Sequence, residues 1–362
     1  MKRLIINEDS IQLAEDLAKS WLIHAFKKCH ETGFSHSRWM FLPSIIAWNK
    51  PYPETSGYII ENFLEFNFKN EYLDGTIGIK TGNALLNNQS HEGYFYSGVN
   101  QIKPSVFNTA QILFGLMQCY QKTKEEKYMT GFNLARNWLI KMMDKNGIWQ
   151  HGLYVDSFLP SYYTRALWPM LLIPSNDNDA IKLEKSLDHF WKNKTSNYSF
   201  VHSGFQPNDN FYLTHTIAYT IEGFMECALL MKRQDILEYC LQSLKVLAQI
   251  IEHENGLAGK YNAEWQSSHS FRCVTGQAQF CSLYAKAFQI NQNVVFKKTA
   301  LFLFEELMSW QIKSKNIELN GAFPASLPIY GSYFPFRYVN WTNKFFLDAC
   351  YQIKKIIKQT AF

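Results

Sequence analysis

The feature that most constrains this sequence is a loop that recurs six times along its 362 residues. Each copy opens with a glycine and an apolar or aromatic residue, and then runs through aromatic and polar residues into the next apolar segment. The six glycines stand at successive spacings of 60, 54, 57, 52 and 65 residues. They are Gly33, Gly93, Gly147, Gly204, Gly256 and Gly321. A recurring period of this kind is typical of a fold built by repeating one supersecondary unit.

The segments between these loops carry apolar residues at helical spacing, as Ile11, Ala14, Ala18 and Leu22 illustrate. Strand-like alternation is scarce. The pattern therefore predicts about twelve helices, one on each side of every loop. Their expected ranges are 9–31, 54–69, 71–87, 106–121, 125–143, 161–173, 178–193, 213–231, 234–253, 273–290, 294–312 and 340–357.

Six similar α-hairpins can bury all their apolar faces by closing into a ring of inner helices surrounded by outer ones. We therefore expect an all-α fold, an (α/α)6 toroid that forms a single domain over residues 1–362. The alternative is an open α-solenoid, but such solenoids repeat at about 34 to 47 residues and usually have short loops.

Composition narrows the possible partners. The formal net charge of +5 is spread along the chain without a basic block, so we expect no nucleic-acid partner. No apolar run approaches the roughly 20 residues that a membrane-spanning helix needs. Seven cysteines without a C-x-x-C pair, together with the absence of a signal-peptide core, predict a cytoplasmic protein with reduced thiols. The oligomeric state is left open.

The chemistry is expected where the loops lead into the inner helices, because the first turns of those helices face one central funnel. These starts are polar or aromatic, unlike ordinary buried helix starts. They lie at 53–58, 107–111, 162–165, 214–219, 275–279 and 340–344. Helix capping is the simpler explanation for Asn108, Thr214 and Asn340.

Three residues at or near these starts are candidate acid/base groups. Glu54 follows Pro53 in a first helical turn, and His215 and Glu222 share one helical face with Tyr219 at i, i+4 and i+7. An imidazole beside a carboxylate can exchange protons with a substrate. We therefore predict Glu54, His215 and Glu222 as catalytic residues. In the alternative, Glu222 bonds a neighbouring helix, His215 is a packing residue and Glu54 stabilises a helix dipole.

The aromatic content of 16% indicates a sugar ligand, because flat rings with polar edges suit the CH and OH faces of a pyranose. The expected substrate-binding residues are Trp48, Tyr52, Trp149, Tyr163, Arg165, Tyr219, Trp265, Arg272, Gln277, Tyr330, Arg337, Asn340 and Lys344. Lys344 and Asp348 can instead form an i, i+4 ion pair. We expect Glu54, His215, Glu222 and Arg337 to share one pocket. No metal or nucleotide motif is present, so no cofactor is expected.

The sequence also resembles a known family over nearly its whole length. The similar segments are 48–58 (WNKPYPETSGY), 107–116 (FNTAQILFGL), 214–223 (THTIAYTIEG), 259–265 (GKYNAEW), 272–279 (RCVTGQAQ) and 321–348 (GAFPASLPIYGSYFPFRYVNWTNKFFLD). They resemble the VpsJ-like proteins of bacterial exopolysaccharide, capsule and lipopolysaccharide clusters, which implies a six-hairpin toroid of surface-polysaccharide biosynthesis. The family tends to carry Asp where this chain has Asn108 and Asn262, and either change removes a carboxylate.

Two classes of function remain. A carbohydrate-active enzyme could act as a hydrolase, with Glu54 and Glu222 flanking the glycosidic bond. It could also act as a lyase or epimerase, in which a Tyr or His removes a proton while Arg165, Arg272 or Arg337 holds a sugar carboxylate. The alternative is a non-catalytic glycan-binding or assembly factor, whose sign would be aromatic rings without a paired acid. A toroid acting on a prenyl lipid carrier would need an acidic motif that is absent here.

Overall fold

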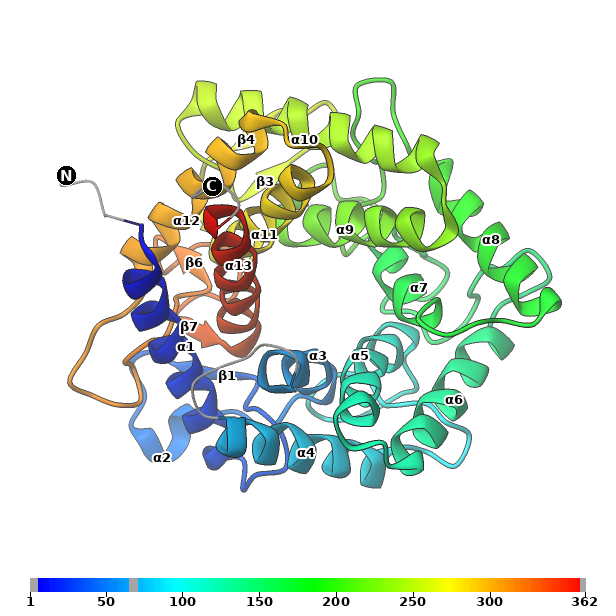
Figure 1. Ribbon diagram of the computed structural model, residues 1–362, viewed down its shortest axis with the longest axis horizontal. Helices are drawn as coiled ribbons and strands as arrows, with labels where there is room; N and C mark the ends of the chain where they lie inside the picture. The colour runs from blue at the N-terminus through cyan, green and yellow to red at the C-terminus, as the bar shows by residue number, and fades with distance from the viewer. Residues whose placement is uncertain (1–5, 65–70, 359–362) are drawn as a thin grey trace.

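The computed structural model describes residues 6–64 and 71–358, which form a ring of six helical hairpins (Figure 1). The outer helices are α1 (Glu8–Lys28), α4 (Glu71–Asn88), α6 (Glu126–Lys141), α8 (Asp177–Trp191), α10 (Gln234–Glu254) and α12 (Val294–Trp310). The inner helices are α3 (Pro53–Leu64), α5 (Val106–Thr123), α7 (Thr164–Met170), α9 (Thr214–Met231), α11 (Val274–Asn291) and α13 (Asn340–Lys358). The expected helical residues 65–69 lie outside the described part of the chain.

The inner helices pack side by side around the ring, and α13 packs against both α11 and α3, so the last hairpin closes on the first. The closed ring, and not the open solenoid, is therefore the observed architecture. Glycines allow two of these contacts to be close. A Cβ atom on Gly57 of α3 would lie 2.6 Å from the Cα of Ile112 in α5. One on Gly223 of α9 would lie 2.4 Å from the backbone nitrogen of Arg165 in α7.

The recurring glycine has a structural reason. Gly93 and Gly147 have φ angles of 102° and 75°, which side chains rarely adopt. A Cβ atom on Gly93 would lie 2.3 Å from the carbonyl oxygen of Leu134, and one on Gly147 would lie 2.3 Å from that of Lys182. Both oxygens belong to the next outer helix along the chain. Each of these two loops thus crosses the backbone of the following outer helix, where only glycine fits.

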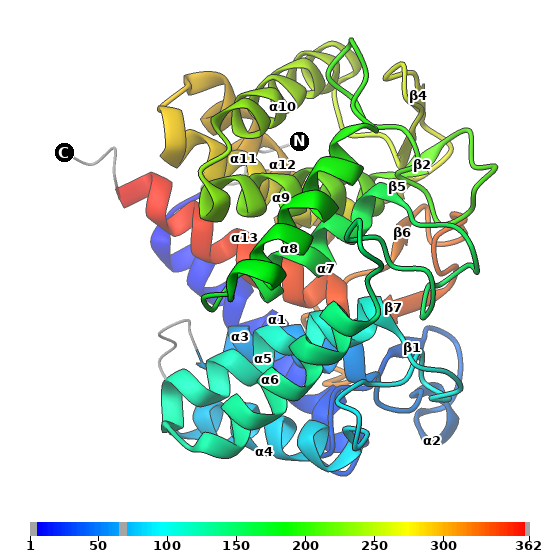
Figure 2. The same cartoon turned by 90° about the vertical axis from the view of Figure 1, so that its right-hand side faces the viewer.

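The long loops gather at the end of the ring where the inner helices begin (Figure 2). They contain short antiparallel strands that join loops of separate hairpins. The pairs are β1 (Ser37–Trp39) with β7 (Arg337–Val339) and β5 (Arg272–Cys273) with β6 (Ser326–Leu327), and β2 (Tyr212–Leu213), β3 (Lys260–Tyr261) and β4 (Ser267–Ser268) form a third sheet. Helix α2 (Ser44–Ala47) lies in the first loop.

One inner helix differs from its expected range. A 3-10 turn, η1 (Ser161–Tyr163), occupies the first residues of the predicted 161–173 helix, and α7 ends at Met170, directly after Pro169. All seven cysteines are buried free thiols. Within residues 6–64 and 71–358, no helix combines the length and apolarity needed to cross a bilayer.

Candidate functional site

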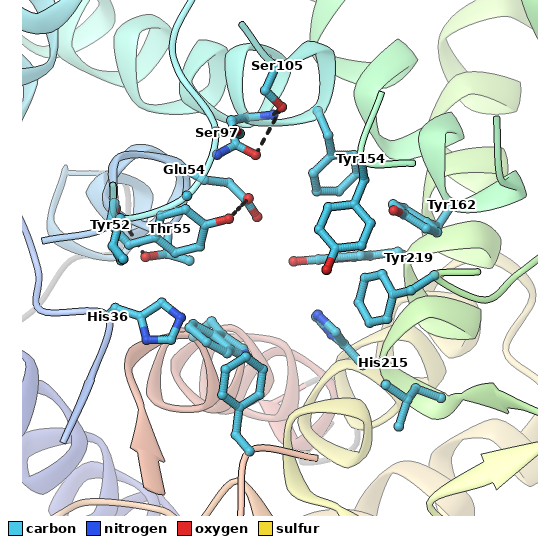
Figure 3. A pocket seen from close by; sticks show the side chains of 18 of the residues that line it. His36, Tyr52, Glu54, Thr55, Ser97, Ser105, Tyr154, Tyr162, His215 and Tyr219 are labelled. Atoms are coloured by element: carbon cyan, nitrogen blue, oxygen red, sulfur yellow. Dashed lines mark hydrogen bonds between the residues drawn. The ribbon is translucent and has the colours of Figure 1, made fainter. Parts of the chain in front are cut away.

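A cavity of about 780 Å³ lies at the loop end of the ring, where the first turns of the inner helices meet (Figure 3). Residues of α3, α5, η1, α9 and α13 and of the loops before them line it. Nearly half of the lining residues carry aromatic rings. The rings come from His36, Tyr52, Tyr58, Phe107, Tyr154, Tyr162, Tyr163, Phe205, His215, Tyr219, Tyr333, Phe334 and Trp341.

Glu54, in the first turn of α3, is the one carboxylate among the described residues that line the cavity. The hydroxyl of Tyr52 and the amide nitrogen of Asn108 both donate hydrogen bonds to Glu54 Oε2, the second over 2.8 Å. Glu54 Oε1 accepts no hydrogen bond from the described residues. Oε1 is therefore the oxygen that can exchange a proton with a ligand.

Asn108 faces Glu54 because another residue caps its helix. The N-cap of α5 is Ser105, whose hydroxyl accepts from the Asn108 backbone N–H over 3.2 Å. The Asn108 amide is thereby free to donate to Glu54, while its oxygen accepts from the backbone N–H of Gly98 over 3.2 Å. The capping interpretation does not hold for Asn108. An amide at this position leaves the site with a single carboxyl group.

Burial raises the pKa of Glu54 to about 7, although the Tyr52 hydrogen bond and the charge of Arg165 act in the opposite direction. A carboxyl group with this pKa is partly protonated and partly ionised at neutral pH. Glu54 can therefore donate or accept a proton without a change of pH, as general acid/base catalysis requires.

His215 extends from the first turn of α9, on a different wall of the cavity from Glu54 (Figure 3). Its Nδ1 lies 2.8 Å from Oε1 of Gln279 in α11. An amide oxygen can only accept a hydrogen bond. This contact assigns the proton to Nδ1 and leaves the lone pair of Nε2 free. Burial lowers the pKa of His215 to about 4, so the ring is neutral at physiological pH. His215 is thus a potential proton acceptor.

Glu222, the third expected catalytic residue, does not line the cavity. It is buried in an ion pair with Arg165, and its other oxygen lies 3.1 Å from Lys286 Nζ. Burial would raise its pKa, but Arg165 and Lys286 outweigh that effect and hold it near 2. The guanidinium of Arg165 lies 4.7 Å from the ring centre of Tyr219, which separates it from the cavity. The structure thus brings together Glu54, His215 and Arg337, without Glu222.

The expected substrate-binding residues divide into two groups. Tyr52, Tyr163, Tyr219 and Arg337 line the cavity. The others lie outside it and bond or pack elsewhere. They are Trp48 (against Trp21), Trp149 (to the Leu139 carbonyl), Arg165 (to Glu222), Trp265 (to the Asn197 carbonyl), Arg272 (to the Leu257 carbonyl), Gln277 (to Glu306), Tyr330 (exposed), Asn340 (to the Ser35 carbonyl) and Lys344 (to Glu61 and Asp348).

Several lining residues were not singled out from the sequence. Phe107, Tyr162 and Trp341 stand inside the polar helix starts and could have been chosen by position alone. His36 lies in the first long loop and reaches the cavity only because β1 pairs with β7. No metal-ligand cluster of three or more His, Cys, Asp or Glu side chains occurs within the described ranges.

No protein-family model and no curated protein matches the sequence. Solved structures do match the fold. An unsaturated glucuronyl hydrolase specific for heparin has a TM-score of 0.74 at 12% identity, over 97% of this chain and 99% of that one. The unsaturated glucuronyl hydrolase of Bacillus sp. GL1 gives 0.73 at 13%, over 96% and 97%. The cellobiose 2-epimerase of Bacillus thermoamylovorans B4167 gives 0.69 at 10%, over 94% and 98%.

The protein is an (α/α)6 toroid. At these low identities the likeness concerns the fold, since one toroid can carry different chemistries. The role of the cavity therefore depends on its own residues. In this toroid those residues are an aromatic wall, one carboxyl group with a pKa near 7 and a neutral imidazole.

Proposed function

We propose that this toroid is a carbohydrate-active enzyme that binds a saccharide in its central cavity and transfers a proton through Glu54. The observation that carries the proposal is that Glu54 is buried, has a pKa near 7 and has an Oε1 atom that accepts no hydrogen bond from the described residues. Glu222 differs, because Arg165 and Lys286 pair with its two oxygens and keep it ionised. The aromatic wall supplies the surface on which a pyranose can stack.

The lining residues favour a lyase- or epimerase-type reaction over glycoside hydrolysis by a pair of carboxyl groups. Hydrolysis of that kind requires two carboxyl groups that flank the scissile bond. Among the described lining residues Glu54 supplies the one carboxyl group. Its neighbour Asn108 is an amide, and Glu222 is paired with Arg165 outside the cavity. We therefore assign Glu54 as the acid and His215 Nε2 as the base in a lyase- or epimerase-type reaction. Structural neighbours named as a sugar epimerase and as glycan hydrolases are compatible with such a site.

The resemblance to VpsJ-like proteins supplies the biological context of the proposal. We place the substrate among the glycan intermediates of bacterial surface-polysaccharide biosynthesis, handled in the cytoplasm. Non-catalytic glycan binding is the second candidate, and one observation favours it. The wall combines many aromatic rings with a single carboxyl group, the arrangement expected of a binding or assembly factor.

Turnover and binding measured together distinguish the two functions. A panel of neutral and acidic oligosaccharides is incubated with the protein, and products are followed by mass spectrometry and NMR. An enzyme converts at least one member of the panel, and Glu54→Gln removes this conversion while the saccharide still binds. A binding factor binds members of the panel without converting any, and Glu54→Gln then leaves its affinity nearly unchanged.

A further inference from the structure

Arg337, the first residue of β7, lines the cavity with a charge that no carboxylate of the described residues balances. It forms no ion pair with a carboxylate of the described residues, and its buried Nε atom has no hydrogen-bond partner. Arg38 and Arg233 differ. Arg38 pairs with Glu318 over 3.0 Å, and Arg233 pairs with Asp235 over 2.9 Å. A partly buried guanidinium without such a partner is costly unless a ligand completes it.

The position of the Arg337 guanidinium is fixed by aromatic contacts. Its central carbon lies 3.8 Å from the ring centre of Trp39 and 5.7 Å from that of Phe334. Trp39 belongs to β1, which pairs with β7, so the stack is held by backbone hydrogen bonds. Stacking covers a face of the planar group and leaves its N–H edges for hydrogen bonds. Arg337 is thereby oriented before any ligand arrives.

The electrostatics of the wall agree with this arrangement. Burial lowers the pKa of Arg337, and no carboxylate of the described residues offsets the effect. Its charge adds to burial in lowering the pKa of His36 to about 4, which keeps that ring neutral. The other lining cation, Lys103, lies 3.3 Å from the exposed carboxylate of Asp156. Arg337 therefore contributes the unbalanced positive charge of the described wall.

We infer that the cavity selects saccharides that carry an anionic group, and that Arg337 binds this group through its N–H edges. The inference rests on the proposed function and narrows its substrate class to acidic sugars. Carboxylate, phosphate and sulfate groups share the required geometry, because each can accept two parallel N–H bonds. A neutral sugar would fill the same cavity and leave the guanidinium unpaired, which is the physical basis of the selection.

Isothermal titration with matched monosaccharides tests the inference. The probes are methyl β-glucoside, methyl β-glucuronide, glucose 6-phosphate and glucose 6-sulfate. We expect the wild type to bind at least one anionic probe about tenfold or more tightly than the glucoside. Whichever anionic probe binds best identifies the group. Arg337→Met should remove the preference for the anionic probe, whereas Arg337→Lys should keep part of this preference. Arg233→Gln is the matched control and should change nothing.

The outcomes distinguish failure of this inference from failure of the proposed function. Equal affinity for neutral and anionic probes, or a preference that survives in Arg337→Met, overturns the selection and leaves saccharide binding intact. Failure of the wild type to bind any saccharide of this set or of the oligosaccharide panel overturns both. If Arg337→Met does not fold, ionic strength decides. Raising the salt from about 20 to 500 mM should weaken binding of the anionic probe alone. Equal weakening of both probes, or of neither, contradicts the inference.

Discussion

Replacing Glu54 with Gln should make the protein more stable at alkaline pH while abolishing its turnover. The side chain is buried, and its pKa is raised from the usual 4.5 to about 7. Because the folded state holds its proton more tightly than the unfolded state, stability falls as the pH rises through this window. Each pKa unit corresponds to 1.36 kcal/mol, so the full cost of ionising Glu54 in the fold is about 3 kcal/mol.

An amide keeps the shape of the side chain and its acceptor for Tyr52 and Asn108, but it has no charge to bury. Glu54→Gln should therefore exceed the wild type in stability by about 3 kcal/mol at pH 8 and by only about 1 kcal/mol at pH 5. For a chain of 362 residues, 3 kcal/mol corresponds to a rise in Tm of about 4 °C.

Calorimetry at pH 5, 6, 7 and 8 measures this difference directly. The matched control is Glu252→Gln on the exposed surface of α10, whose Tm difference from the wild type should not vary with pH. The reasoning fails if Glu54→Gln is less stable than the wild type by the same amount at every pH. Glu54 would then be an ionised structural residue, and its proposed role in proton transfer would lose its physical basis.

Four further outcomes are expected. Arg165→Met should lower the free energy of unfolding, measured by chemical denaturation, by about 3 to 5 kcal/mol, because Glu222 keeps Lys286 but loses its other ion-pair partner. A loss below about 1 kcal/mol contradicts this expectation. Gln279→Leu should remove the hydrogen bond that keeps the proton on Nδ1 of His215, and NMR should then show altered imidazole nitrogen shifts with Tm nearly unchanged. Unaltered shifts would refute the assignment of the proton to Nδ1. The pKa of His215 near 4 predicts stability lost as the pH falls from about 6.5 to 4, and His215→Gln should flatten that part of the Tm profile. A chain that ends at residue 336 should lose its cooperative helical unfolding in circular dichroism, because it lacks α13, and a native-like melt would show that closure is dispensable.

The fold could be predicted from the sequence because its repeat has a local cause. At Gly93, Gly147 and Gly321 a loop crosses the backbone of an outer helix so closely that a Cβ atom would not fit, which explains the glycine in three of the six repeats. Helical periodicity supplied the helices themselves, and their expected bounds differ from those observed by a few residues. The start of the third inner helix is the exception, because the 3-10 turn Ser161–Tyr163 is too short to show an apolar pattern of its own.

The site could be predicted only in part, because position on a helix does not say how deep a side chain lies. Glu54 and His215 stand in first turns and reach the cavity, whereas Glu222 stands two turns further along the same helix as His215. That distance places Glu222 outside the cavity, behind the Tyr219 ring, where it forms an ion pair with Arg165. Long-range pairing was equally hidden, since the contact between Arg337 and Trp39 depends on strands about 300 residues apart.

The most direct test of the account is a crystal structure of the Glu54→Gln protein with the saccharide that binds best in the panel. The account predicts an ordered sugar ring stacked on the aromatic wall of the cavity. A ring hydroxyl or bridging oxygen should lie within hydrogen-bond reach, about 2.6 to 3.2 Å, of the substituted amide, with His215 Nε2 facing the same ring. A saccharide that binds on the outer surface, or that leaves position 54 and His215 without contact, would contradict it.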